Sequence, residues 1–220
     1  MVEERYVITC DKDSVYLSRD KANHMYLIEF KAVNSKIRID AILTFDIYKL
    51  IYELNKDMFE SYHIAYPDPA DPSRAELLFI FKSFMGLGER YTYVLAHMPH
   101  LLDSGQEQEK EQEQEQEQEQ DKLQGQGQVI NIRSANVPNN APSLLRHLIP
   151  RRAEQIDSDN SNIRIHVQPD GHAIQFYYNF RWQLSKPGDI IPIPPFVDKA
   201  ISTMMKRMFV RLKQFIEYIG

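Results

Sequence analysis

The sequence has almost no cysteine and no long apolar run. Cys10 is the one cysteine among 220 residues, which excludes an intramolecular disulfide and fits a reducing compartment. No segment approaches the roughly 20 consecutive apolar residues that a transmembrane helix needs. The acidic start, MVEERYVITC, lacks the apolar core of a secretory signal. We therefore expect a cytoplasmic or nuclear protein that does not span a membrane.

Motifs that carry chemistry are also missing. The Gly86–Gly88 turn has no third glycine and no following Lys-Ser/Thr, so it does not match a nucleotide loop. His97 and His100 are three residues apart at the end of a strand, which is not the i, i+4 helical spacing of a zinc protease. The adjacent Asp11 disfavours a thiolate at Cys10. We expect no catalytic, cofactor-binding or metal-binding residues, and hence no enzyme.

A low-complexity run of Gln and Glu divides the chain. Residues Asp103–Gln128 contain one apolar side chain, Leu123, and no aromatic residue. They cannot bury enough surface to offset the entropy of ordering, so we expect a disordered insertion. Nine acidic residues and two lysines give this run a charge of −7, whereas the whole chain carries −5. The remainder, at +2, is slightly basic.

The N-terminal part, residues 1–102, has the pattern of strands around one helix. Ser35–Leu43 alternates apolar and polar residues in its first half, as a half-buried strand does. Thr44 suits an N-cap, and apolar residues then recur at helical spacing, which predicts a helix over Phe45–Met58. The other strands expected here are Arg5–Cys10, Ser14–Ser18, Met25–Ala32, Tyr62–Tyr66, Ala75–Phe84 and Arg90–Met98.

The C-terminal part, residues 129–220, has the strongest patterns. Between Asn162 and Trp182, apolar and polar residues alternate on both sides of the Pro169–Gly171 turn, which predicts a long hairpin with one apolar face. Phe196–Ile219 holds no glycine or proline and predicts a long helix. Its expected apolar stripe consists of Val197, Ile201, Met204, Met208, Leu212, Phe215 and Ile219.

These patterns predict an α+β fold. We expect a mostly antiparallel β-sheet or sandwich with two covering helices, the C-terminal one long, and a disordered Glu/Gln-rich insertion. The expected organisation is a β-rich part with one helix at 1–102, the insertion at 103–128, and a hairpin plus long helix at 129–220. Neither flank of the insertion makes a convincing core alone, so both are expected to belong to one globular body.

Two surfaces are candidates for binding. The polar face of the hairpin and the outer face of the last helix could stack bases and contact phosphates of single-stranded nucleic acid. The short helical segment 143–149 could enter the groove of a protein partner, although such a segment more often packs on its own core. The candidate nucleic-acid-binding residues are Arg164, His166, Tyr177, Arg181, Lys199, Lys206, Arg207 and Lys213, and the candidate docking residues are Leu145, Leu148 and Ile149.

The segment Lys12–Ser18, with the sequence KDSVYLS, and the strands around Met25–Ile37 resemble the telokin-like protein family of baculoviruses. The resemblance implies a β-barrel or sandwich accessory protein without known catalysis. The succession of strands and a helix is also loosely similar to single-strand-binding modules of the PUR and whirly type. The function expected from the sequence is a non-catalytic interaction or structural accessory protein of a large DNA virus, with a protein partner or a homo-oligomer. The alternative is a nucleic-acid-binding module.

Overall fold

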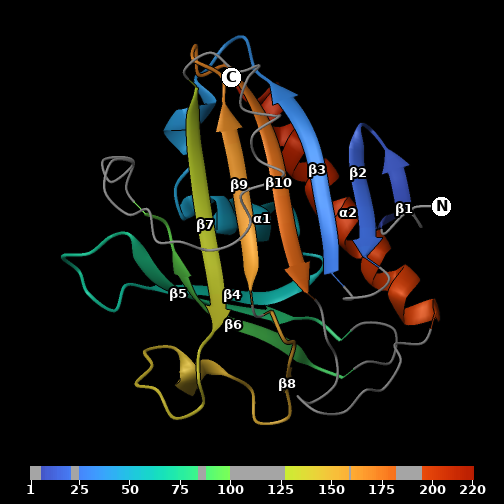
Figure 1. Ribbon diagram of the computed structural model, residues 1–220. Helices are drawn as coiled ribbons and strands as arrows, with labels where there is room; N and C mark the ends of the chain where they lie inside the picture. Colours follow the sequence, from blue (N-terminus) through green and yellow to red (C-terminus); the bar gives the residue numbers. More distant parts are fainter. Residues whose placement is uncertain (1–5, 21–24, 84–87, 100–126, 159, 182–194) are drawn as a thin grey trace.

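The computed structural model describes residues 6–20, 25–83, 88–99, 127–158, 160–181 and 195–220 (Figure 1). Their strands form one sheet in the order β1-β2-β3-β10-β9-β7-β6-β5-β4, with antiparallel neighbours throughout. The short β8 pairs with β6 in parallel. The strands are β1 (Tyr6–Lys12), β2 (Val15–Asp20), β3 (Met25–Val33), β4 (Phe59–Ala65), β5 (Arg74–Phe81), β6 (Arg90–His97), β7 (Gln128–Asn136), β8 (Glu154–Gln155), β9 (Ser161–Val167) and β10 (Ala173–Arg181).

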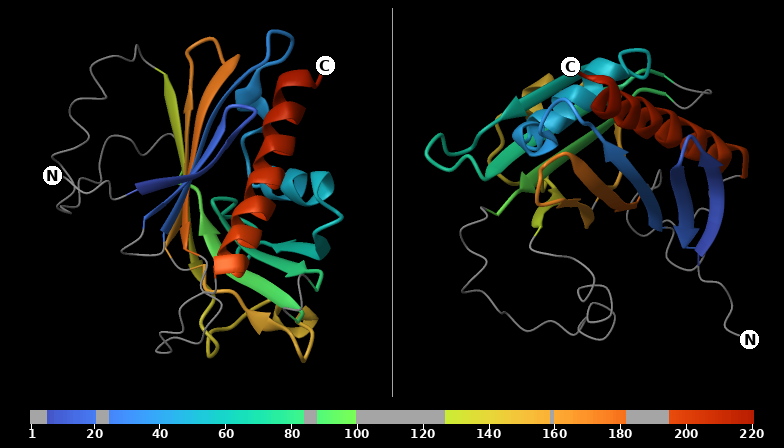
Figure 2. Two further views of the ribbon diagram at one scale, coloured as in Figure 1. Left: turned by 90° about the vertical axis from the view of Figure 1, so that its right-hand side faces the viewer. Right: turned by 90° about the horizontal axis from the view of Figure 1, so that it is seen from above.

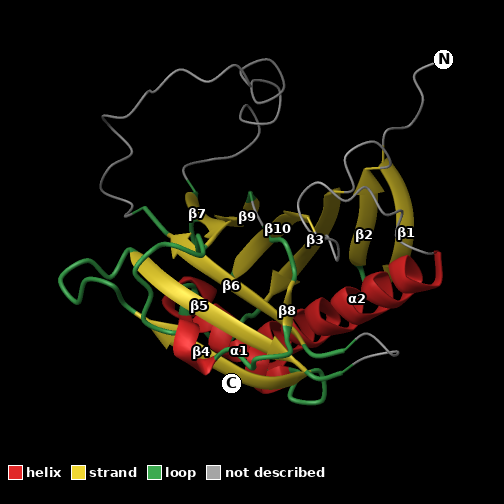
Figure 3. Ribbon diagram, turned by 90° about the horizontal axis from the view of Figure 1, so that it is seen from below, coloured by secondary structure: helices red, strands yellow, loops and turns green. Residues whose placement is uncertain are grey.

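Two α-helices, α1 (Asp46–Leu54) and α2 (Pro195–Tyr218), lie on one side of the curved sheet (Figure 2). Figure 3 shows α2 extending from α1 along the sheet towards β1. Phe209 of α2 packs on Phe176 and Tyr178 of β10, with ring centroids 5.6 Å apart in both pairs. The predicted mostly antiparallel sheet with two helices, the second one long, is confirmed. The predicted disordered insertion lies almost entirely outside the described residues.

Strands from both sides of the Gln/Glu run contribute to this one sheet. β3 pairs with β10 along its whole length, from Met25 opposite Arg181 to Val33 opposite Ala173. Stacked rings strengthen the junction, since the centroids of Phe30 and Phe176 are 4.7 Å apart. The apolar face of the β9–β10 hairpin therefore belongs to a core that the N-terminal strands complete.

The strand predicted over Ser35–Leu43 is wrong. The chain bends there and forms a 3₁₀ turn at Ile39–Ile42. The buried Asn34 side chain explains the difference: its Oδ1 accepts the backbone N–H groups two and three residues further on, at 2.8 and 3.1 Å. Its Nδ2 donates to the carbonyls of Ile216 and Ile219, at 2.7 and 2.8 Å. These bonds satisfy backbone groups without a strand ladder and fix the end of α2.

The ends of α1 also differ from the prediction. Asn55 donates from Nδ2 to the carbonyl of Ile51 at 2.8 Å, which satisfies an orphan carbonyl and ends the helix at Leu54. The predicted continuation to Met58 is therefore wrong. At the other end, the helix begins at Asp46 with Phe45 as its N-cap, so the predicted N-cap at Thr44 is wrong by one residue, although Thr44 Oγ1 accepts the N–H of Asp46 at 3.1 Å.

The buried face of α2 lies partly beside the predicted stripe. Phe215 and Ile219 are only half-buried, whereas three large apolar residues outside the stripe, Met205, Phe209 and Ile216, are buried. Val197 lies outside the described side chains. Burying seven apolar side chains of medium or large size contributes at most about 10–20 kcal/mol to the free energy of folding before the entropy cost is subtracted. The helix α2 is therefore a principal part of the core. Its buried apolar residues of medium and large size are Ile201, Met204, Met205, Met208, Phe209, Leu212 and Ile216.

A second, smaller core lies on the other face of β5 and β6. Alternation along β5 sends Leu77 towards α1 and α2, whereas Leu78 faces outwards. The chain from 137 to 149 covers this outer face with Val137 and Leu145. The sheet is therefore covered on both faces at β5 and β6, by the helices on one side and by a loop on the other.

Candidate ligand-binding cavity

A cavity of about 90 Å³ lies between the sheet and the two helices. Its walls come from α1, α2, strands β4 to β7, β9 and β10, and the segment after β8, and they are mainly aromatic and aliphatic. Ligand pockets usually measure about 300–1,000 Å³, so a lipid-sized ligand requires the walls to move. Two wall residues of α2, Met205 and Met208, suit such repacking because their side chains are unbranched and polarizable.

Four hydroxyl groups form a small polar cluster in this apolar wall. Ser134 of β7 lies directly opposite Ser161 of β9 in the strand register, and both are buried. The nearby side chain of Ser134 opposes the rise in the pKa of Tyr48, and that of Ser161 opposes the rise in the pKa of Tyr178. All four residues line the cavity. We call Tyr48, Ser134, Ser161 and Tyr178 the hydroxyl quartet.

Burial disfavours the ionised form of the two tyrosines in the quartet. Removal from water raises the pKa of Tyr48 to about 12, against the opposing effect of the nearby Ser134 side chain. Burial raises the pKa of Tyr178 as well, and the nearby Tyr48 adds to the rise. Both phenols therefore stay neutral at physiological pH, where they act as hydrogen-bond donors and acceptors.

The rest of the wall carries little charge. Among the described side chains that line the cavity, Arg181 is the one charged group, and no Asp, Glu, His, Cys or Lys is present. A second hydroxyl pair joins Ser158 Oγ and Thr92 Oγ1 at 3.4 Å. The part of the chain that the structure describes has no group of three or more His, Cys, Asp or Glu that could hold a metal ion, and His100 lies outside that part.

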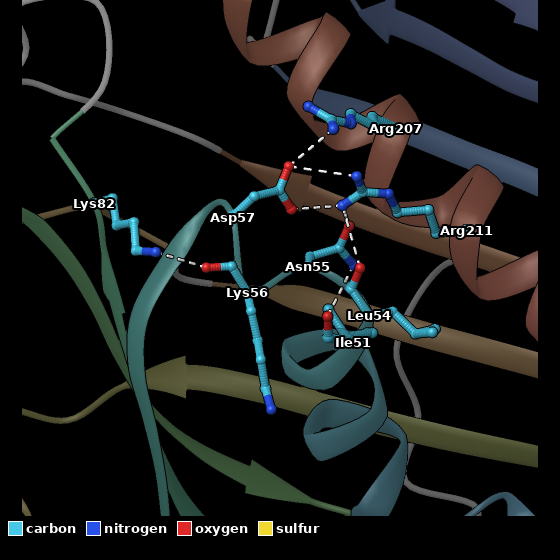
Figure 4. Close-up of polar contacts among 8 residues, drawn as sticks. All are labelled: Ile51, Leu54, Asn55, Lys56, Asp57, Lys82, Arg207 and Arg211. Atoms are coloured by element: carbon cyan, nitrogen blue, oxygen red, sulfur yellow. Dashed lines mark hydrogen bonds and ion pairs between the residues drawn. The ribbon is translucent and has the colours of Figure 1, made fainter.

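One carboxylate joins α2 to the turn between α1 and β4, beside the cavity (Figure 4). Asp57 accepts hydrogen bonds from Arg211 at 2.6 and 3.3 Å. It also forms an ion pair with Arg207, with the N and O atoms 2.9 Å apart. The Arg211 guanidinium holds the pKa of Asp57 below its usual range. Arg211 also donates to the carbonyl of Leu54 and to Asn55 Oδ1, both at 3.1 Å. These contacts hold α2 against the end of α1 and the turn that follows it.

The structure separates the candidate nucleic-acid-binding residues of the hairpin from those of the helix. Arg164, His166 and Tyr177 alternate with buried residues of β9 and β10, so they lie on the outer face of the sheet. Tyr177 lies opposite Arg164, and its ring meets that of His166 edge-on at 5.7 Å. Arg181 instead lines the cavity on the other side.

The basic residues of α2 lie on the side of the sheet that the helices cover, away from that outer face. Lys199 is exposed and Lys206 is half-buried. Arg207 pairs with Asp57, and Lys213 Nζ pairs with Glu217 at 2.7 Å. The two sets therefore do not form one surface for a nucleic acid, and part of the helix set is already neutralised by acids of the same chain.

The candidate docking segment is partly used by the protein's own core. Leu145 is 7% exposed and packs in the outer-face core. A 3₁₀ turn at Arg146–Leu148 follows it. Leu148 remains 36% exposed, and Ile149 is half-buried against the same core. The three side chains therefore do not present a common apolar face to a partner.

The sequence patterns do not single out the quartet. Tyr48 lies within the predicted helix Phe45–Met58, and Tyr178 occupies an apolar position in the alternation of the hairpin. The usable signal was a small polar residue at the start or end of an apolar strand face, namely Ser134 and Ser161. Recognising that the two serines face each other required the register of β7 and β9.

No protein-family model and no curated protein matches the sequence. Among solved structures, the human StarD13 (DLC2) lipid transfer and protein localization domain is 12% identical with a TM-score of 0.60, over 97% of this chain and 90% of that chain. Human StAR-related lipid transfer protein 5 is 11% identical with a TM-score of 0.59, over 97% and 87%. A STAR-related lipid transfer protein from Xanthomonas axonopodis is 10% identical with a TM-score of 0.52, over 96% of both chains. The chain thus has the fold of StAR-related lipid-transfer domains.

These likenesses correct several expectations from the sequence. The resemblance to telokin-like viral proteins is wrong, because the solved structures that share the fold are lipid-transfer domains. The predicted functions of a viral accessory protein and of a nucleic-acid-binding module are overturned with it. So are the predicted protein partner or homo-oligomer and the likeness to PUR and whirly modules. Within the described residues, no helix is both long and apolar enough to cross a membrane.

Proposed function

We propose that this protein binds an apolar, lipid-like small molecule in the cavity between the sheet and α2. The observation that carries the proposal is the cavity itself, which lies at the centre of the fold and has mainly apolar walls with a few convergent hydroxyls. That composition is typical of small-molecule sites. The shared fold with domains named for lipid transfer supports the same conclusion.

Binding on this proposal involves no catalysis. A serine, threonine or tyrosine hydroxyl needs an adjacent general base such as His, Lys or a carboxylate to act as a nucleophile, and the described lining offers none of these bases. We place the protein in the cytoplasm or nucleus, because a single cysteine fits a reducing compartment.

A ligand larger than the cavity must displace α2 or repack its methionines. Exposed ion pairs contribute little stability, so the contacts of Asp57 with Arg207 and Arg211 allow α2 to move at modest cost in free energy. The buried Asn34 contacts hold the far end of the same helix. The proposed entry movement is therefore a displacement of the part of α2 that bears Met205 and Met208.

Two adjacent residues of β6 give a matched test. Val94 is 4% exposed and lines the cavity, whereas Leu95 is 39% exposed and faces outwards. Purified full-length protein should bind Nile red, an uncharged dye whose fluorescence rises in apolar surroundings. Val94→Phe fills the cavity and should weaken binding by about tenfold, which corresponds to about 1.4 kcal/mol. Leu95→Phe should leave binding unchanged.

Thermal unfolding of both variants separates lost binding from lost folding. Wild-type protein that does not bind Nile red would overturn the proposal. Equal dye affinity of a folded Val94→Phe variant and the wild type would also overturn it, because the dye would then bind elsewhere.

A further inference from the structure

The geometry points to a ligand class: apolar molecules that carry one uncharged oxygen group able to hydrogen-bond, such as an alcohol, bound with that group at the hydroxyl quartet. This inference rests on the proposed ligand-binding function and specifies the ligand further. It predicts discrimination against anionic and cationic head groups on the same hydrocarbon chain.

The quartet has spare hydrogen-bonding capacity. A hydroxyl offers one donor and two acceptor positions, so even a mutual contact between Tyr48 and Ser134 and between Tyr178 and Ser161 would use only part of the capacity of these four cavity-lining groups. Because Ser134 and Ser161 are opposite each other in adjacent strands, the two pairs lie side by side. An alcohol oxygen placed there can accept one hydrogen bond and donate another.

The surroundings of the quartet disfavour charge. Phe180 and Phe209 line the same cavity, and Tyr48 and Tyr178 are buried deeply enough that the pKa of each rises. An ionic head group taken from water into such a site loses more hydration free energy than neutral hydroxyls restore. Neutral oxygen groups lose far less on transfer.

Arg181 is the group that could oppose this preference. It is the last residue of β10, three residues beyond Tyr178, which is roughly 10 Å along a strand. It also already engages a neighbouring group of the protein. A head group held at the quartet therefore lies away from the end of the strand that bears the one charge of the wall.

The test compares three head groups on one hydrocarbon chain. Dodecanol below its solubility limit, and dodecanoate and dodecyltrimethylammonium below their micelle concentrations, compete with Nile red for the whole 220-residue protein. Dodecanol should bind at least about fivefold more tightly than either ion, the effect of one hydrogen bond. The Ser134→Ala/Ser161→Ala variant should reduce that advantage by about fivefold.

Ser158→Ala is the matched control, because it removes a hydroxyl from another part of the same wall, and it should keep the preference. If the double variant does not fold, Tyr178→Phe removes one quartet hydroxyl and preserves the ring. It should then lower the affinity for dodecanol selectively.

Three results would overturn the inference. The first is equal displacement of the dye by all three compounds. The second is preferential binding of dodecanoate that Arg181→Gln abolishes, which would make Arg181 the selecting group. The third is loss of the dodecanol preference in Ser158→Ala and not in the quartet variants. Absence of Nile red binding to the wild type would instead refute the proposed function, so the two failures are distinguishable.

Discussion

The outer face of β5 and β6 and the inner face under α2 both bury tyrosine hydroxyls. On the outer face, the Tyr93 hydroxyl donates to the carboxylate of Glu76 and accepts the N–H of Leu145 at 3.3 Å. Glu76 also accepts the N–H of Leu144 at 2.9 Å. The protein's own loop therefore supplies the partners, and its side chains cover the surface.

On the inner face, the polar side chains near the Tyr48 and Tyr178 hydroxyls are Ser134 of β7 and Ser161 of β9. Here a cavity of about 90 Å³ remains between sheet and helix. The comparison indicates that a buried polar cluster stabilises the fold where a backbone segment supplies its remaining hydrogen-bond partners. Where the cluster opens on a cavity, it can recognise a ligand. The following variants test this contrast, from the largest expected effect to the smallest.

Phe209→Ala should have the largest effect. Phe209 is 1% exposed and packs on Phe176 and Tyr178, and removing a buried Phe side chain costs about 3–5 kcal/mol of unfolding free energy. Because the lost volume adjoins the cavity, dodecanol should restore part of the stability, measured by thermal unfolding. Phe209→Leu is the milder control. A loss of stability that dodecanol does not reduce would contradict the assignment of this cavity as the ligand-binding site.

Glu76→Ala should cost about 2–4 kcal/mol in urea unfolding, because two buried donors lose a charged acceptor. Glu76→Gln retains one acceptor oxygen and should cost less. Since Glu76 lies on the outer face, the affinity of the folded variant for Nile red should not change. A loss of dye affinity in a folded Glu76→Ala protein would remove the distinction between the two faces.

Tyr48→Phe tests the neutrality of the quartet through alkaline stability. The folded pKa of Tyr48 is about 12, against 10.0 when unperturbed. The stability associated with this rise is present below pH 10 and is lost as the pH rises towards 12, because the unfolded state ionises first. At about 1.4 kcal/mol per pKa unit, the limit is about 2–3 kcal/mol. Tyr48→Phe should therefore lose less stability over that range than wild type. Tyr16→Phe, at an exposed site, should match wild type.

Asp57→Asn should have the smallest effect on stability. Asp57 is 44% exposed, so solvent screens its ion pairs and their loss should cost about 0.5–1 kcal/mol. Since the folded pKa of Asp57 is lowered, this stability is present above the unfolded pKa and is lost as the pH falls through the folded value. The variant should bind Nile red faster in stopped-flow measurements. An unchanged association rate would show that these contacts do not limit entry.

Local sequence patterns predicted the helices and strands whose formation depends little on contacts with distant parts of the chain. The hairpin at 162–182 and the last helix follow from periodicity alone. The strand prediction over Ser35–Leu43 failed because the side chain of Asn34, which follows β3, donates hydrogen bonds to the carbonyls of Ile216 and Ile219 at the end of α2. This contact joins residues that are far apart in the sequence. The partial error in the predicted apolar stripe of α2 arose because the curved sheet buries Phe209 and Ile216 as well.

The candidate site was less accessible from sequence. Its residues come from eight helices and strands and the segment after β8, and single serines on apolar strands carry no motif. The strand order that places β7 beside β9, with Ser134 opposite Ser161, had to be known first. Conversely, the basic residues that suggested a nucleic-acid surface could be placed on opposite sides of the sheet only from the fold.

Methionine methyl resonances provide the most direct test of the central claim that a ligand binds between the sheet and α2. Met205 and Met208 line the cavity, whereas Met98 packs at the core outside its lining. In protein labelled with ¹³C at the methionine methyls, added dodecanol should shift the Met205 and Met208 resonances in a saturable manner and leave that of Met98 in place. Shifts confined to other methionines, or no saturable shift at all, would contradict the claim.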